Sequence, residues 1–350
     1  MRLGKRSWPI AVAVVAMAAA GFASPDARAA SYHVILGGSG GEAEFSEQFR
    51  AWGTRLRDAL VMRMGVPTDR VVLLSEPETE HAPSFATTNL ESIRGVFAAM
   101  ADQVTPDDDL YVYLIGHGSY LKNISKFHIP DEDLSATELN ELLNRISARR
   151  VVVLNSTSSS AGFINVMSDP ERIICSATKS VSEVNATEFM GFFIEGLEDG
   201  SADRNHDDRI SFLEACEQAA ELTASWYTTE GLLATEHAIV DDNADGLGSR
   251  LPIELVTILS DGNDDADGEE ILDGALSRSC FIKDYQFHPD VSQELIDRYL
   301  RTLEAVEALK ERKPELDAPT YLTELERLLI EAARVNRDIR AFGPAPNLDS

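Results

Sequence analysis

The sequence has few cysteines and few basic residues, and each shortage excludes a class of protein. Three cysteines in 350 residues cannot build a disulfide scaffold, because at most one pair can form among Cys175, Cys216 and Cys280. Lys and Arg number 31 against 59 Asp and Glu, which gives a net charge of −28. Such a surface repels nucleic acid and anionic membranes and attracts cations, so we expect no nucleic-acid partner.

Long apolar runs are also missing beyond residue 29, where no stretch approaches the ~20 residues of a membrane span. The N-terminal stretch WPIAVAVVAMAAAGF follows three basic residues and precedes ARA at 27–29, a cleavage-type motif. These features predict a signal peptide over residues 1–29. We therefore expect a periplasmic or secreted protein with no membrane span after cleavage.

From residue 31 onward, apolar runs alternate with amphipathic helical patterns. The predicted strands are YHVILGG, DRVVLLS, DDDLYVYLIGHGS, RRVVVLN and RIICSAT. Helical patterns lie between them, with Asn89 as an expected N-cap and Ser135 and Glu138 as an expected capping box. The alternation predicts an α/β fold, a three-layer α/β/α sandwich with a mainly parallel sheet. In such sheets the sites lie at the carboxyl ends of the strands.

The C-terminal part is predicted to be helical and separate from the sheet. Two amphipathic helices over 291–342 are interrupted around Lys313 and Pro314, which predicts a helical hairpin, because proline disfavours a continuous helix. The predicted organisation is a signal peptide at 1–29, an α/β domain at 30–260, an acidic linker at 261–290 and the hairpin. The hairpin either packs on the domain or supports self-association through 291–342.

Two predicted strands end in residues suited to acyl-transfer chemistry. In YLIGHGSY, His117 follows a strand and lies between two glycines. In VVVLNSTSSSAGF, the following strand runs into small hydroxyl residues, a glycine and an aromatic residue. Because the carboxyl ends of parallel strands meet at one edge of the sheet, we expect these two motifs to lie close together.

This pair of motifs resembles that of the caspase-like cysteine peptidases, in particular legumain and its bacterial relatives. In that family a strand ends in His-Gly, and the next ends in Ala-Cys-x-Ser-Gly-Gly-Phe or a close variant. Residues 157–163, TSSSAGF, align with the second motif, and the resemblance covers roughly residues 31–235. It implies that His117 is the catalytic histidine, that the amide of Gly118 helps to hold the oxyanion, and that Ser158 occupies the cysteine position.

Ser158 stands where the family has its catalytic cysteine, and this difference decides what the resemblance predicts about activity. A thiol is partly ionised near neutral pH and strongly nucleophilic, whereas a serine hydroxyl needs a base within hydrogen-bond reach. We therefore expect a catalytically degenerate peptidase homologue, a pseudoenzyme that binds a peptide or protein segment. The alternative is an active serine-dependent peptidase that uses His117 with Ser158, or with Ser159 or Ser160. A third class is a structural envelope protein that acts through its C-terminal hairpin.

Residues 203–214, DRNHDDRISFLE, match the spacing of an EF-hand-like calcium loop. Such loops place oxygen ligands at positions 1, 3, 5, 7, 9 and 12. Those positions are filled by Asp203, Asn205, Asp207, Arg209 through its carbonyl, Ser211 and Glu214. Asp208 stands at position 6, where glycine is usual, and aspartate tolerates the left-handed backbone needed there. The loop therefore predicts bound Ca²⁺.

Two further acidic stretches follow. DDNADGLG, at 241–248, begins like a second calcium loop with Asp241, Asn243, Asp245 and Gly246, but its twelfth position is Pro252. DGNDDADG, at 261–268, has the composition of a solvated linker. The spacing in the first stretch leaves an independent site open, and it stays outside the predicted ligand set.

Overall fold

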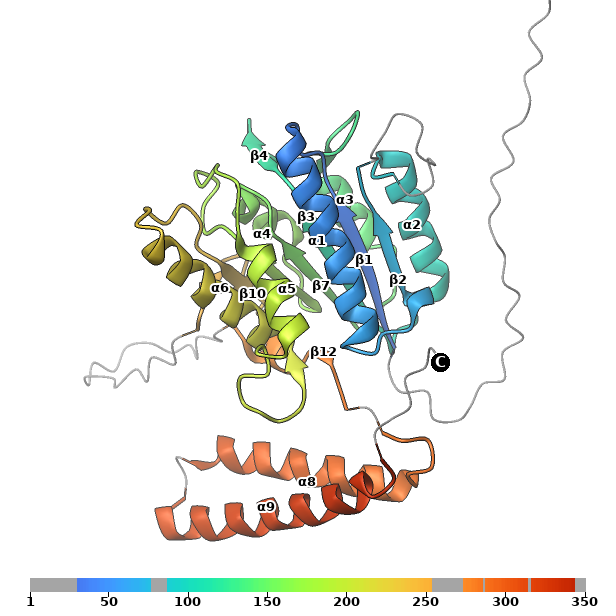
Figure 1. Ribbon diagram of the computed structural model, residues 1–350, viewed down its shortest axis with the longest axis vertical. Helices are drawn as coiled ribbons and strands as arrows, with labels where there is room; N and C mark the ends of the chain where they lie inside the picture. Colours follow the sequence, from blue (N-terminus) through green and yellow to red (C-terminus); the bar gives the residue numbers. More distant parts are fainter. Residues whose placement is uncertain (1–29, 77–86, 254–272, 286, 314–315, 344–350) are drawn as a thin grey trace, which may run out of the picture.

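The computed structural model describes residues 30–76, 87–253, 273–285, 287–313 and 316–343, which form a layered α/β body with a helical hairpin below it (Figure 1). The predicted signal peptide, residues 1–29, lies outside the described residues. Among the helices of these ranges, none combines the length and apolar composition that a membrane span requires.

A seven-stranded sheet forms the centre of the molecule, in the order β11-β10-β8-β7-β3-β1-β2. Neighbouring strands from β2 to β8 run parallel, whereas β10 and β11 pair antiparallel at one edge. The strand bounds are β1 Ser31–Gly37, β2 Val71–Leu74, β3 Asp109–Ile115, β7 Arg150–Asn155, β8 Arg172–Ser176, β10 Ile239–Asp241 and β11 Ser249–Arg250. The predicted α/β fold with a mostly parallel sheet is thus confirmed, and the antiparallel edge is an addition to it.

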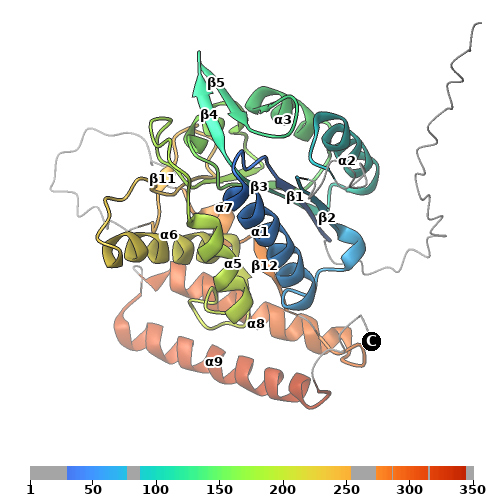
Figure 2. The same cartoon turned by 45° about the horizontal axis from the view of Figure 1, so that its top comes forward.

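Helices cover both faces of the sheet (Figure 2). One face packs against α1 (Ala43–Met62), α5 (Phe189–Asp199) and α6 (Phe212–Thr229). The other packs against α2 (Leu90–Gln103), α3 (Ala136–Leu143) and α4 (Ile164–Met167). Strand β3 shows why both faces are apolar. Tyr111 and Tyr113 point into the first layer, whereas Val112 and Leu114 point into the second.

Local capping signals act where the sequence places them. Asn89 accepts a hydrogen bond from the Ser92 amide at the start of α2, at 2.8 Å. Ser135 and Glu138 form the expected capping box at the start of α3. Ser211 and Glu214 form a second box at the start of α6. Each box satisfies amide groups that a helix N-terminus would otherwise leave unpaired.

Several short strands are not predicted from the sequence. Strands β4 (Gly118–Leu121), β5 (Ile124–Phe127) and β6 (Leu134–Ser135) form a small antiparallel sheet above β3. Strand β9 (Ile210–Ser211) pairs with β12 (Phe281–Lys283).

Part of the segment expected to be an acidic linker is built into the domain. Within the described residues of 261–290 it contains α7 (Ala275–Arg278) and β12. Cys280 lies between them, fully buried in the core. All three cysteines are buried and free, so none of them forms a disulfide in this structure.

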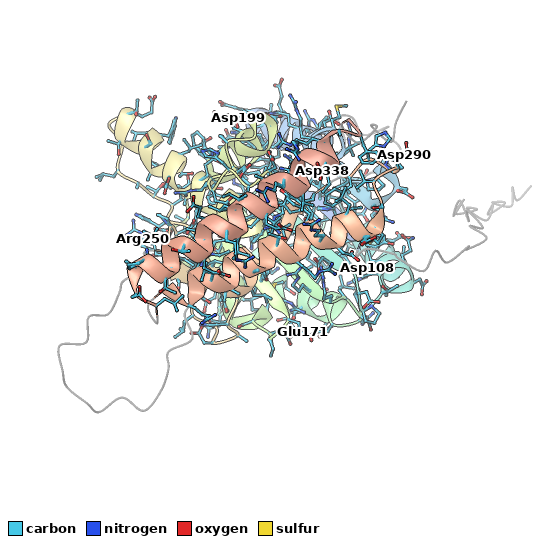
Figure 3. All side chains as sticks on the ribbon, turned by 90° about the horizontal axis from the view of Figure 1, so that it is seen from below. Asp108, Glu171, Asp199, Arg250, Asp290 and Asp338 are labelled. Carbon is cyan, nitrogen blue, oxygen red and sulfur yellow. The ribbon has the colours of Figure 1, made fainter. Side chains whose placement is uncertain are left out.

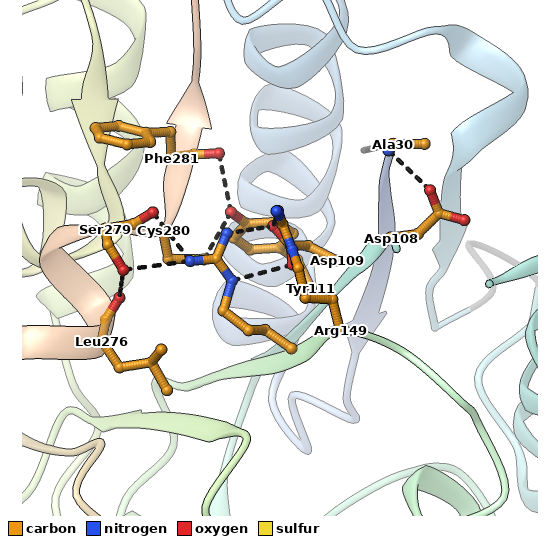
Figure 4. Close-up of polar contacts among 10 residues, drawn as sticks. Ala30, Asp108, Asp109, Tyr111, Arg149, Leu276, Ser279, Cys280 and Phe281 are labelled. Atoms are coloured by element: carbon orange, nitrogen blue, oxygen red, sulfur yellow. Dashed lines mark hydrogen bonds and ion pairs between the residues drawn. The ribbon is translucent and has the colours of Figure 1, made fainter. Parts of the chain in front are cut away.

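A polar network fastens this segment to the amino ends of β3 and β7 (Figure 4). The Asp109 carboxylate accepts hydrogen bonds from Arg149 and Arg150, with shortest distances of 2.6 and 2.7 Å. Arg150 also donates to the Ser279 carbonyl at 2.9 Å, and the Tyr111 hydroxyl donates to the Phe281 carbonyl at 2.9 Å. Burial raises the pKa of the Asp109 carboxyl, but the hydrogen bonds and charges of Arg150 and Arg149 outweigh it and hold this pKa below its usual value.

The C-terminal hairpin consists of α8 (Gln293–Glu311) and α9 (Ala318–Arg340), which lie side by side beneath the sheet (Figures 1 and 3). Its inner face buries Tyr299, Val335 and Ile339 together with Tyr285, which precedes the hairpin. The predicted interruption near Lys313 is confirmed, because α8 ends at Glu311 and α9 begins at Ala318.

We expect His33 to make the protein sensitive to acid. Its ring is fully buried and stacks on Tyr111 at 4.6 Å, and burial lowers its pKa from 6.5 to about 3. Between those values the unfolded chain binds a proton that the folded chain does not. This contribution to stability is complete above pH 6.5 and falls by about 1.4 kcal/mol per pH unit as the pH drops towards 3.

Urea unfolding in EDTA between pH 7 and pH 4 measures this dependence. The variant His33→Gln should flatten the curve by about one proton relative to wild type. His206→Asn, at an exposed position with φ of 58° that asparagine tolerates, is the control variant for the loss of a histidine. Equal slopes for His33→Gln and wild type would contradict the expectation.

Candidate functional site

The candidate site lies at the carboxyl edge of the parallel strands, where the loops after β1, β3 and β7 meet. Backbone hydrogen bonds join these loops, from Gly38 to Ile115 and from Ser39 to His128. Gly38 is required here, because an added Cβ would lie 2.5 Å from the His128 carbonyl oxygen. The glycines after β1 thus permit close packing of the loops.

His117 follows β3 directly and is half-buried. Its ring lies edge-on to Phe45 and Phe49, with centroid distances of 4.7 and 5.0 Å. Burial lowers its pKa and the nearby His128 lowers it further, whereas a backbone hydrogen bond with Gly40 and the charge of Glu42 oppose this shift. The lowered pKa favours the neutral imidazole, which has a ring nitrogen that can accept a proton.

Ser158 follows β7 and is 3 % exposed. Its hydroxyl donates to the Gly118 carbonyl at 3.0 Å and accepts from the Gly118 amide at 3.2 Å. The structure therefore brings Ser158 and Gly118 together, as the motif pair predicts. Among the described residues, however, no hydrogen bond joins His117 to Ser158, and the Gly118 amide already has Ser158 as its partner.

The other hydroxyl groups of this loop serve similar structural purposes. Thr157 donates to the Asn155 side chain at 2.8 Å. Ser160 forms a buried network with Ser176 and Thr178, at 2.8 and 3.0 Å. Ser159 has a left-handed backbone with φ of 54°, its amide donates to the Glu183 carbonyl at 2.8 Å, and its side chain is 2 % exposed. The loop is thus rigid and its hydroxyls are largely paired.

Sequence reasoning missed a group of polar residues around His117. Glu76, after β2, accepts hydrogen bonds from the Ser39 hydroxyl at 3.1 Å and the Gly40 amide at 3.3 Å. His128, after β5, contacts the Ser119 hydroxyl at 2.8 Å through Nε2. The sequence pattern that could have indicated this group is weak, because β4 and β5 are short. His128 lies near the site only because these two strands pair.

A cavity of about 820 Å³ opens beside the end of β8, between α6 and the chain that leads into β10. Its lining combines Phe189, Tyr227 and Leu232 with the polar residues Glu236 and His237. Sequence reasoning missed this feature too, because its lining comes from segments far apart in the chain. Apolar walls with a few fixed polar groups are typical of ligand sites.

The charged groups of the cavity are held firmly. Glu236 is 4 % exposed, and its carboxylate accepts from the Glu188 and Phe189 amides at 2.8 and 3.2 Å, at the start of α5. Burial raises the pKa of Glu236 to about 7 in spite of these bonds. His237 contacts Glu183 at 2.5 Å, and through Glu183 the cavity adjoins the Ser159 loop.

Residues 203–214 form a compact loop between α5 and α6. Asp203 accepts hydrogen bonds from the Asp207 and Asp208 amides, each at 3.0 Å. Asp208 has φ of 68°, the left-handed conformation that the sixth position requires. Glu214 reaches back over the loop and accepts from the Asn205 amide at 3.3 Å. Hydrogen bonds between its own side chains and amides therefore close this loop.

Two contacts compete with metal binding in this loop. The Asp207 carboxylate pairs with the Arg209 guanidinium at 3.1 Å, and Glu214 is also bonded to Ser211. Within the described ranges, no group of three or more His, Cys, Asp or Glu side chains is gathered closely enough to hold a metal ion. The predicted ligands thus share one loop, with their oxygen atoms bonded to protein donors.

Comparison with known proteins adds no identity, because no protein-family model and no curated protein matches the sequence.

We expect the packing of Gly118 against the β7 loop to be essential for stability. An added Cβ would lie 2.5 Å from the Ser158 carbonyl oxygen and 2.6 Å from Thr157 Oγ1. Gly118→Ala should therefore lower the free energy of unfolding by about 1–3 kcal/mol. Gly95→Ala is the matched control, because the new methyl group at this exposed helix position meets no atom within 4 Å. It should stabilise by about 0.5–1 kcal/mol, and equal effects in chemical denaturation would contradict the packing argument.

Proposed function

We propose that this chain is a catalytically degenerate relative of the caspase-like and legumain-like peptidases that binds a peptide or protein segment. The carrying observation is that the Ser158 hydroxyl is bonded to both peptide groups of Gly118. A serine nucleophile must instead have its proton within reach of a base. Among the described residues His117 forms no hydrogen bond with it, and Phe45 and Phe49 pack against the histidine ring.

The cavity next to the Ser159 loop supports a binding role. Its volume of about 820 Å³ lies within the range of ligand-binding pockets. Leu232 and Leu233 on its rim are 54 % and 89 % exposed, which leaves apolar surface for a ligand to cover. The fixed carboxyl group of Glu236 and the His237 ring provide polar contacts for orientation.

The rival function, a serine-dependent peptidase, is favoured by the lowered pKa of His117. A histidine with a lowered pKa is available as a base near neutral pH. For that activity the Ser158 hydroxyl would have to leave Gly118 and turn towards the imidazole, which would also release the Gly118 amide for an oxyanion. The two functions therefore differ in whether the Ser158 hydroxyl leaves Gly118 and forms a hydrogen bond with the His117 imidazole.

Covalent labelling and peptide binding on the full mature chain separate the two functions. We expect no labelling of Ser158 by a peptidyl phosphonate, and no loss of peptide binding in Ser158→Ala. Peptides selected from a library by wild type should bind at least about tenfold more weakly to Leu233→Asp, because a charge on the rim opposes apolar burial. Met62→Asp, at a 74 % exposed site away from the cavity, is the matched control.

Labelling of Ser158 that disappears in His117→Ala would establish the serine peptidase instead. Peptide binding that is equal in Leu233→Asp and Met62→Asp would exclude the cavity as the binding site.

We also propose that residues 203–214 bind Ca²⁺ and that this ion stabilises the domain. The supporting observations are the left-handed Asp208 and the approach of Glu214 to Asn205. The side-chain oxygen atoms would come from Asp203, Asn205, Asp207, Ser211 and Glu214, and Arg209 would supply its carbonyl. Calcium accepts such mixed oxygen ligands, with affinities of ~10⁻⁴–10⁻³ M in extracellular modules.

Titration of the EDTA-treated chain with Ca²⁺ tests this site. Glu214→Gln should weaken binding at the loop at least about tenfold, because glutamine keeps the capping box with Ser211 but removes the charged ligand. Glu138→Gln changes the equivalent residue of the α3 capping box and should leave calcium binding unchanged. Equal binding in both variants would exclude Glu214 as a ligand.

The proposal includes export to the periplasm or the exterior, consistent with the predicted signal peptide and with the use of calcium. It also includes self-association through the hairpin. Leu322, Leu329 and Ile330 are 60 %, 49 % and 44 % exposed along α9, at a spacing that places them on one side of the helix.

A further inference from the structure

Asp241, the last residue of β10, is a buried carboxylate without a partner. It is 1 % exposed, and among the described residues neither of its carboxylate oxygens has a hydrogen-bond donor. The other buried carboxylates are paired. Asp273 accepts from the Asp242 amide and from Ser249, and Asp242 accepts from the Gly274 and Ser277 amides. An unpaired ionised carboxylate is costly to bury, so this position calls for a balancing group.

The surroundings of Asp241 add negative charge and oxygen atoms. Burial raises its pKa, and the charges of Asp273 and Asp245 raise it further. The Ser168 hydroxyl and the Ala244 amide lie close enough to lower it, although neither reaches hydrogen-bond geometry with the carboxylate. Among the described residues no Lys or Arg forms an ion pair with Asp241. A cation from solution would supply the missing positive charge.

The turn after Asp241 carries side-chain oxygen atoms of the kind that bind metal ions at alternate positions, 243 and 245. Asn243 Oδ1 accepts from the Asp245 amide at 2.9 Å, and Asp245 accepts from the Leu247 amide at 2.6 Å. Gly246 has φ of 73°, and its amide donates to the Ser168 hydroxyl at 3.1 Å, which ties that hydroxyl to the turn. These hydrogen bonds thus hold the turn in place next to the end of β10.

We propose that Asp241, Asn243 and Asp245 bind a hard divalent cation, Ca²⁺, with the Ser168 hydroxyl beside them. Calcium takes six to eight oxygen ligands, which include carboxamide and carbonyl oxygen and water as well as carboxylate. This donor set contains two carboxylates, one carboxamide and one hydroxyl, so it lies outside clusters built from three or more acidic, histidine or cysteine side chains. The site is separate from residues 203–214 and does not depend on peptide binding.

A cation at this site would also affect the wall of the cavity that contains Glu236 and His237. Strand β10 pairs with β11 through Ile239 opposite Arg250. Arg250 and Leu251 line the cavity, as does Ala238 immediately before β10. A cation at the other end of β10 would neutralise Asp241 and hold these two strands in place.

Calcium titration by calorimetry on the full mature chain, after treatment with EDTA, tests the site. Wild type should show two binding events, and Asp241→Asn should lose one of them while it retains the event that Glu214→Gln removes. In EDTA, Asp241→Asn should unfold at a higher temperature than wild type, because the amide removes a buried charge. Asp102→Asn, at an exposed helix position, should leave both events unchanged.

Asp245→Asn provides a second variant, since this side chain is exposed and its replacement spares the core. It should weaken the same event about tenfold or more, a cost typical of altered metal ligation. If Asp241→Asn and Asp245→Asn both bind Ca²⁺ like wild type, the inference is overturned, whatever Glu214→Gln does. If Glu214→Gln binds like wild type and Asp241→Asn loses all binding, the site at 241–245 stands and the one at 203–214 fails.

Discussion

The parallel alignment of β1, β3, β7 and β8 is the constraint on which the rest of the molecule depends. It brings all their carboxyl ends to one edge, where the loops with His117 and Ser158 meet. It brings their amino ends to the other edge, where Asp109 faces two arginines. Since both faces of the sheet are covered by helices, these two edges and the antiparallel end are where the sheet can present polar groups. The candidate site, the anchoring network and the Asp241 turn each occupy one of them.

Burial explains why the hydroxyl groups of the Ser158 loop are hydrogen-bonded to the ends of the strands. Residues 156–160 are nearly inaccessible to solvent, so each hydroxyl or amide without a partner would cost free energy. Ser156 bonds to the Leu114 carbonyl at 2.7 Å, Ser158 bonds to Gly118, and Ser160 bonds to Ser176. A buried cysteine would have little need of such bonds, because its thiol is a weak donor. The hydroxyl groups of this loop thus supply hydrogen bonds to the strand ends that a thiol would make only weakly.

The sequence predicts the parts of this fold whose causes are local. Apolar runs located the five parallel strands, and Asn89 and Ser135 marked helix starts because a cap needs only the next three residues. Strands β10, β11 and β12 were missed, since two or three residues carry no periodicity and their pairing depends on distant partners. The motif pair correctly brought Ser158 to Gly118. The hydrogen bonds of Ser158 to the Gly118 backbone depend on turn geometry, which residue types alone do not determine.

Contacts around residues 203–214 link this loop to the hairpin as well as to the domain. The Arg209 guanidinium lies over the Phe281 ring at 4.0 Å and the Tyr285 ring at 4.8 Å, and Asp208 pairs with Arg340 of α9 at 3.0 Å. The exposed pair contributes little by itself, whereas the stacked arginine belongs to a partly buried aromatic cluster. Because the carbonyl of Arg209 is the expected seventh-position ligand, an ion there would fix the backbone that carries this guanidinium. Metal binding and the docking of the hairpin would then both depend on Arg209. The charge of the loop would thus be coupled to the surface that α8 and α9 present.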